Sequence, residues 1–245
     1  MKSRGEKFLT PEEEKAMAET WQKSSVMLEQ TYKEEDGKRV KEHEYDYVAG
    51  RLESRNSTNS IDHIHQTSFI KEIIPELIRR NQGTKVRVID LGAGAALYAD
   101  QIRESFPHGV EVYSTGLSKR TAEKYREFSK LKKLHPNDLK WRSVRQMSDS
   151  EEFDLIIDTW GEQFYTAEDS GNAIKDLEAY LLAVIKKLKP GGMASIAPVN
   201  LGKKINSFQF HEVLDSIRRG NKIKAEFPVN GRNILRIEKI ESNAK

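Results

Sequence analysis

The chain has 245 residues, of which 37% are apolar and 32% charged, and its formal net charge is +3. This length suits one large domain or a domain with an additional segment. No apolar run approaches the roughly 18–20 residues that span a bilayer, the N-terminal residues lack the apolar core of a secretory signal, and the absence of cysteine excludes disulfides, thiolate metal sites and a cysteine nucleophile. We therefore expect a cytoplasmic protein without a membrane partner.

The first third of the chain differs from the rest. Residues 1–80 carry 14 basic and 16 acidic side chains, whereas the remainder carries 27 and 22. A capping box at Thr10 and Glu13 begins a helix with one apolar face. The polar stretch 55–60 indicates a loop, and a second apolar helix face follows, in which Pro75 predicts a kink or a new helix start. We expect residues 1–80 to form a helical N-terminal extension that serves as a lid over an acceptor site.

The strongest motif lies at residues 85–97, where a strand expected at Val86 to Leu91 enters a glycine-rich turn and then a helix. Gly92 permits the tight turn, and Gly94 lets a ligand approach the backbone closely. The helix start beyond the turn offers N–H groups to a nucleotide-type ligand. A dinucleotide fingerprint has Gly or Ala where Leu97 stands. The motif therefore predicts a nucleotide-type ligand and disfavours a dinucleotide.

Strand-like and helix-like segments alternate after the glycine turn. Strands are expected at Val110 to Ser114, Phe153 to Asp158 and Met193 to Val199. The alternation predicts parallel pairing with right-handed crossovers. Residues 222–240 form two strand-like runs around Asn230-Gly231, which is a hairpin signal. The predicted fold is an α/β, doubly wound, mostly parallel sheet with a C-terminal antiparallel hairpin.

Three of these segments resemble motifs of the class I S-adenosylmethionine-dependent methyltransferases. Residues 88–96 (Val-Ile-Asp-Leu-Gly-Ala-Gly-Ala-Ala) resemble the family's first motif, and residues 153–158 (Phe-Asp-Leu-Ile-Ile-Asp) its fourth-strand motif. Residues 188–192 (Leu-Lys-Pro-Gly-Gly) resemble the turn before its fifth strand. The resemblance implies a seven-stranded sheet in a Rossmann-like domain over residues 81–245, with S-adenosylmethionine as cofactor and methyl transfer as the reaction.

The resemblance also implies which residues bind the cofactor. They are Asp90, Gly92, Ala93, Gly94, Thr115, Gly116, Leu117, Ser118 and Asp158. The family usually ends its second strand in an acid that bonds the ribose hydroxyls, whereas this chain has Thr115 or Gly116 there. The hydroxyls of Thr115 or Ser118 would bond a ribose more weakly than a carboxylate does.

The sequence does not specify the methyl acceptor. In the family the acceptor site lies beyond the fourth strand, where residues 158–165 contain aromatic and acidic side chains but lack the Asn/Asp-Pro-Pro-Tyr signature of members that methylate amino groups on bases. A small-molecule acceptor is favoured. A base is needed only for a hydroxyl or protonated amine acceptor, and the candidate catalytic residues are His63, Asp158 and Tyr165. His63 and His65 lack companion ligands, so no metal site is expected.

Three alternatives stay open. The missing acid at Thr115 is compatible with a methyltransferase-like binding protein that has lost turnover. Basic clusters at residues 130–133 and 218–224 could contact the phosphates of an RNA acceptor. Lys119 and Arg120 could hold the 2′-phosphate of NADP in a reductase, although the expected C-terminal hairpin is unusual for such enzymes. The oligomeric state is not specified by the sequence.

Overall fold

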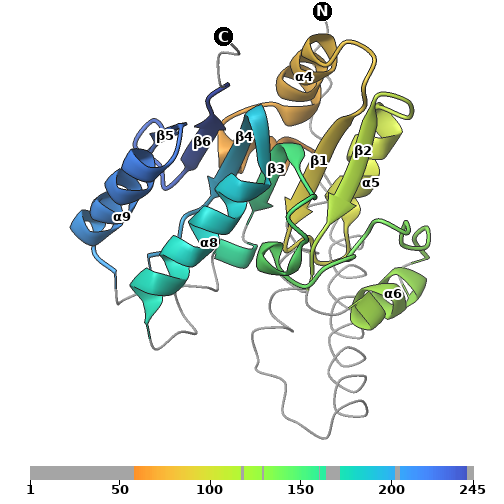
Figure 1. Cartoon of the computed structure of the whole chain (residues 1–245). Coiled ribbons are helices and arrows are strands. Elements are labelled where there is room, and N and C mark those ends of the chain that lie inside the picture. The colour runs from red at the N-terminus through yellow and green to blue at the C-terminus, as the bar shows by residue number, and fades with distance from the viewer. Residues whose placement is uncertain are drawn as a thin grey trace, which may run out of the picture.

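A computed structural model of the chain describes residues 58–116, 119–128, 130–159, 161–163, 172–201 and 205–241. Its centre is a six-stranded sheet in the order β2-β1-β3-β4-β6-β5 (Figure 1). The strands are β1 (Val86–Leu91), β2 (Val110–Ser114), β3 (Phe153–Thr159), β4 (Leu188–Ala197), β5 (Ile223–Glu226) and β6 (Leu235–Lys239). The first four strands pair in parallel, and β6 is antiparallel to both β4 and β5. The doubly wound sheet with a C-terminal hairpin is confirmed.

The expected number of seven strands is wrong for the described residues, which form six. Residues 137–141 follow the outer edge of β2 in the place of the missing strand. The Ser114 N–H donates to the Asn137 carbonyl (3.2 Å), the Lys140 N–H donates to the Ser114 carbonyl (3.2 Å), and a single parallel bridge joins Thr115 to Trp141. Between these contacts Leu139 has a φ of 48°. This left-handed residue interrupts the extended backbone that a regular strand requires.

Helices cover both faces of the sheet (Figure 1). They are α3 (Thr58–His65), η1 (Phe69–Ile73), α4 (Ile74–Arg80), α5 (Leu97–Ser105), α6 (Lys119–Phe128), η2 (Val144–Gln146), α8 (Ala173–Lys187) and α9 (Ser207–Gly220). The segment from α3 to α5 packs with one side of β1 and β3 in one apolar cluster. Helices α8 and α9 pack with the other side in a second cluster. Among the described helices, none combines the length and apolar character of a transmembrane span.

The N-terminal predictions have mixed outcomes. Residues 58–60, predicted as loop, begin α3 instead. The helix is favoured because its next turn buries Ile61 and His65, four residues apart, against the sheet. Pro75 does mark a new helix start, since it lies in the first turn of α4 directly after the π-helical η1. The helix predicted from Thr10 lies outside the described residues, as does most of the proposed lid.

Candidate functional site

The turn between β1 and α5 holds an unusual backbone conformation. Gly92, Gly94 and Ala96 have φ values of 63°, 55° and 58°, a region that suits glycine and is unfavourable for a residue with a Cβ. Ala96 precedes α5 and supplies no side-chain cap. In the described part of the chain, the N–H groups of Gly94 and Ala95 have no hydrogen-bond acceptor. The turn therefore presents unbonded amides at a helix start, an arrangement that suits an anionic or nucleotide ligand.

Thr115, which follows β2, fixes the first half of this turn. Its hydroxyl oxygen accepts the Gly92 N–H (2.8 Å), and its carbonyl accepts the Ala93 N–H (2.8 Å). Thr115 is fully buried, and these two bonds fix the backbone of Gly92 and Ala93 next to the end of β2. At the neighbouring Gly116 a Cβ would lie 2.5 Å from Leu139 Cδ2, so the Leu139 side chain would have to shift to make room for it.

Two buried carboxylates lie at the carboxyl ends of neighbouring strands. Asp90 is the penultimate residue of β1, and Asp158 lies opposite Leu91 in the register of β1 and β3. Asp158 Oδ2 accepts the Gln163 N–H (2.9 Å) and the Tyr180 hydroxyl (2.6 Å). In open α/β sheets, ligands bind in the crevice outside the carboxyl ends of the strands. The glycine turn, Thr115 and both carboxylates therefore meet at the edge where a nucleotide would bind.

Glu162, which sequence reasoning did not single out, belongs to the same edge. Its carboxylate accepts hydrogen bonds from the Ser143 hydroxyl and from the Val144 N–H (2.9 Å). Burial raises the pKa of Glu162 to about 7, against the lowering effect of these two bonds, and the charge of Asp158 raises it further. The available signal in the sequence was a carboxylate three residues after the apolar run that forms β3.

The structure describes two of the three catalytic candidates, His63 and Asp158, which differ in their surroundings. Because His63 and His65 lie on a helix, they point to different sides: His63 is exposed and His65 is buried. His65 Nδ1 lies 2.7 Å from Ser195 Oγ, and Nε2 lies 2.8 Å from Thr159 Oγ1. Asp158 is part of the site, whereas Tyr165 is outside the described residues.

Two of the predicted cofactor residues, Leu117 and Ser118, are also outside the described residues. The structure brings the predicted Asp90, Gly92, Ala93, Gly94, Thr115, Gly116 and Asp158 to one edge of the sheet. Over the described ranges, no group of three or more His, Asp or Glu side chains could hold a metal ion.

Solved structures share this architecture. The plantazolicin methyltransferase BpumL, in a complex with a monoazolic desmethylPZN analog and SAH, matches with a TM-score of 0.51 and 10% identity over 93% of this chain and 99% of that chain. CalS10, an amino pentose methyltransferase from Micromonospora echinaspora, matches with a TM-score of 0.46 and 11% identity over 83% of this chain and 99% of that chain. No family model and no curated protein matches the chain. The match to BpumL shows that the chain has the fold of the class I S-adenosylmethionine-dependent methyltransferases.

Proposed function

We propose that the protein is an S-adenosylmethionine-dependent methyltransferase that acts on a small-molecule acceptor. One observation carries the proposal: the glycine turn presents the amides of Gly94 and Ala95 at the carboxyl edge of this sheet, beside two buried carboxylates. The amides and the carboxylates suit a ligand that carries anionic and cationic groups together.

The residues present fit the proposed cofactor. The amides of Gly94 and Ala95 suit its carboxylate or hydroxyl oxygens, and the carboxylates of Asp90 and Asp158 favour its positively charged groups. In the proposed complex the ribose hydroxyls bind beside Thr115 and Gly116, the residues that follow β2. S-adenosylmethionine supplies an already activated methyl group, so the protein has only to align the acceptor and exclude water. Asp158, held by Tyr180 and Gln163, is suited to orienting a ligand.

A proton-accepting group would be needed for a hydroxyl or ammonium acceptor. Glu162 joins His63, Asp158 and Tyr165 as a candidate, because its pKa of about 7 lets it exchange a proton at neutral pH. The small-molecule class is supported by the absence of an Asn/Asp-Pro-Pro-Tyr signature after β3. It is also supported by BpumL, whose structure holds a desmethylPZN analog. An RNA acceptor is less favoured, because Lys132 and Arg218 of the basic clusters pair with Glu104 and Asp215.

A second candidate function is that of a binding protein with this fold and no turnover. Thr115 favours it, because a hydroxyl that already accepts the Gly92 N–H replaces the carboxylate expected for the ribose. Methyl transfer to any acceptor would exclude this candidate.

Thermal unfolding with S-adenosylhomocysteine tests the proposal. A ligand at 100 times its Kd stabilises the folded state by about 2.7 kcal/mol, which raises the Tm by about 5–10 °C for a chain of this size. NADP is the matched nucleotide control and should leave the Tm unchanged. The proposal fails if neither S-adenosylhomocysteine nor S-adenosylmethionine shifts the Tm or gives a calorimetric signal at millimolar concentration.

A further inference from the structure

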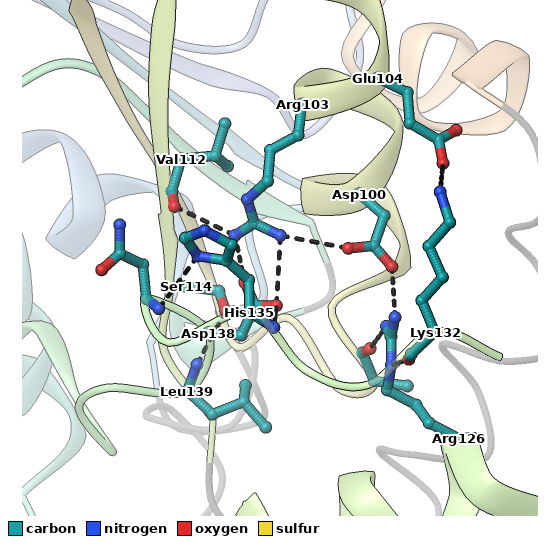
Figure 2. Close-up of polar contacts among 12 residues, drawn as sticks. Asp100, Arg103, Glu104, Val112, Ser114, Arg126, Lys132, His135, Asp138 and Leu139 are labelled. Carbon is teal, nitrogen blue, oxygen red and sulfur yellow. Dashed lines mark hydrogen bonds and ion pairs between the residues drawn. The ribbon is translucent and has the colours of Figure 1, made fainter. Parts of the chain in front are cut away.

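Arg126 on α6 is a fully buried arginine that joins three segments. Only 1% of its surface is exposed. Its Nε donates to the Lys132 carbonyl (2.6 Å), one terminal nitrogen to the Ala95 carbonyl (2.7 Å), and the other to Asp100 Oδ2 on α5 (2.5 Å), as Figure 2 shows in part. A buried charge is retained only where it is paired and hydrogen-bonded. The planar guanidinium is suited to this, because its donors point in fixed, separate directions.

The contact with Ala95 bears on the glycine turn. Thr115 holds the first half of the turn through Gly92 and Ala93, whereas Arg126 holds the second half through the Ala95 carbonyl. The next residue, Ala96, keeps a left-handed conformation that its Cβ disfavours. Such a conformation persists only where surrounding contacts impose it. Arg126 supplies one of those contacts from a different helix.

We propose that Arg126 is a positioning residue of the methyl-donor site, which holds the glycine turn in the conformation that presents the Gly94 and Ala95 amides. The inference rests on the proposed function. Arg126 acts through the Ala95 carbonyl, and its own donors are directed to protein groups. Ligand affinity should therefore depend on a side chain that lies outside every motif of the sequence.

Arg103 on α5 provides a matched comparison. It donates to the other oxygen of the same carboxylate, Asp100 Oδ1 (3.1 Å), to the buried Asp138, and to the Val112 carbonyl (3.0 Å). Figure 2 shows Asp100 between the two guanidinium groups. Arg103 therefore resembles Arg126 in charge and bonding, but its bonds do not reach the glycine turn.

The test compares Arg126→Met and Arg126→Lys with Arg103→Met. Affinity for S-adenosylhomocysteine is measured by calorimetry, and amide hydrogen exchange over residues 92–98 is measured without ligand. We expect Arg126→Met to weaken binding about tenfold or more, the effect of losing one buried hydrogen bond to a charged group, and to speed exchange in the turn. Arg126→Lys keeps the positive charge but loses the planar set of guanidinium donors, so it should weaken binding less than Arg126→Met does. Arg103→Met should lower the Tm yet leave affinity within about twofold, because none of the Arg103 bonds reaches the glycine turn.

Equal affinity in Arg126→Met and the unmutated protein would overturn the inference. So would an equal loss of affinity in Arg103→Met, because the effect would then be a general loss of stability. If Arg126→Met does not fold, the same comparison with Arg126→Lys decides. If the unmutated protein does not bind S-adenosylhomocysteine, the proposed function fails, and the exchange rates alone decide whether Arg126 holds the turn.

Discussion

The hydroxyl of Tyr180 on α8 donates a 2.6 Å hydrogen bond to Oδ2 of Asp158 at the end of β3. Both side chains are buried, so the bond forms in a region of low dielectric constant, where a hydrogen bond to a carboxylate is strong. The Gln163 N–H donates to the same oxygen. The helix layer is thereby joined to the carboxyl edge of the sheet, and the position of Asp158 depends on α8.

Tyr180→Phe should lower the free energy of unfolding by about 1–3 kcal/mol, because it leaves a buried carboxylate with one donor fewer. Urea denaturation measures the change. Tyr113→Phe is the matched control: the Tyr113 hydroxyl donates to Glu111, a surface-exposed carboxylate (3.1 Å), so we expect a loss below about 0.5 kcal/mol. Equal losses in the two variants would show that the Tyr180 bond has no special strength.

Glu162 predicts how stability depends on pH. Its pKa is about 7 in the folded protein, above the ordinary 4.5 that we expect in the unfolded chain. Between these values the folded state keeps a proton that the unfolded state has released, so the free energy of unfolding falls as pH rises. The stabilisation that this proton gives the folded state is fully present below pH 4.5 and lost above pH 7. We expect a loss of about 3 kcal/mol across this range.

Glu162→Gln should remove this dependence and make the protein more stable than the unmutated chain above pH 7. Glutamine does not ionise, its amide oxygen can accept the Val144 N–H, and the Ser143 hydroxyl can rotate to accept from its amide nitrogen. Urea denaturation from pH 5 to pH 8 measures the slope. Glu123→Gln, at an exposed position of α6, should keep the slope of the unmutated protein.

Strands β1 and β2 begin and end where the sequence predicts, because short apolar runs bounded by turn residues determine them locally. The edge beyond β2 could not be predicted in the same way. Its pairing is interrupted by the left-handed Leu139, which has no sequence signal of the kind that glycine gives. The expectation of a seventh strand came from the resemblance. The left-handed backbone at Leu139 prevents residues 137–141 from forming that strand.

In the candidate site, too, the sequence predicts only the parts that are formed by local segments. Asp90 and the glycine turn are recognisable because one continuous segment forms them. Arg126 resembles an ordinary surface charge in the sequence, and its burial depends on acceptors 26 and 31 residues away along the chain. Glu162 likewise depends on groups 18 and 19 residues away. Contacts of this range follow from tertiary packing, which local patterns do not determine.

Gly161 is a position where close approach excludes any side chain. A Cβ there would overlap both Asp158 Oδ1 and the Leu91 carbonyl. Gly161→Ala should therefore destabilise the protein by about 2 kcal/mol or more, and it should weaken S-adenosylhomocysteine binding because it displaces Asp158. Gly220→Ala is the control, because a Cβ at Gly220 meets no atom within 4 Å and its φ is not left-handed. A fold unaffected by Gly161→Ala would contradict the close contact with Asp158.

His63 and His65 form a natural pair of test positions, since they share one helix but not one environment. His65 lies between Ser195 Oγ and Thr159 Oγ1, at 2.7 and 2.8 Å, and is fully buried. His65→Ala leaves two buried hydroxyls without this partner and opens a cavity, so we expect a loss of about 2–4 kcal/mol in the free energy of unfolding. His63→Ala, at an exposed position, should change it by less than about 0.5 kcal/mol.

The same two variants separate a structural histidine from a catalytic one. If His63 accepts a proton from the acceptor, His63→Ala should lower the rate of methyl transfer by about 10²–10⁴-fold at unchanged Tm. His65→Ala should instead lower the Tm and change the rate only as far as the folded fraction falls. An active His63→Ala enzyme would remove His63 as the base, and the assignment would pass to Glu162, whose Glu162→Gln variant is then the measurement to make.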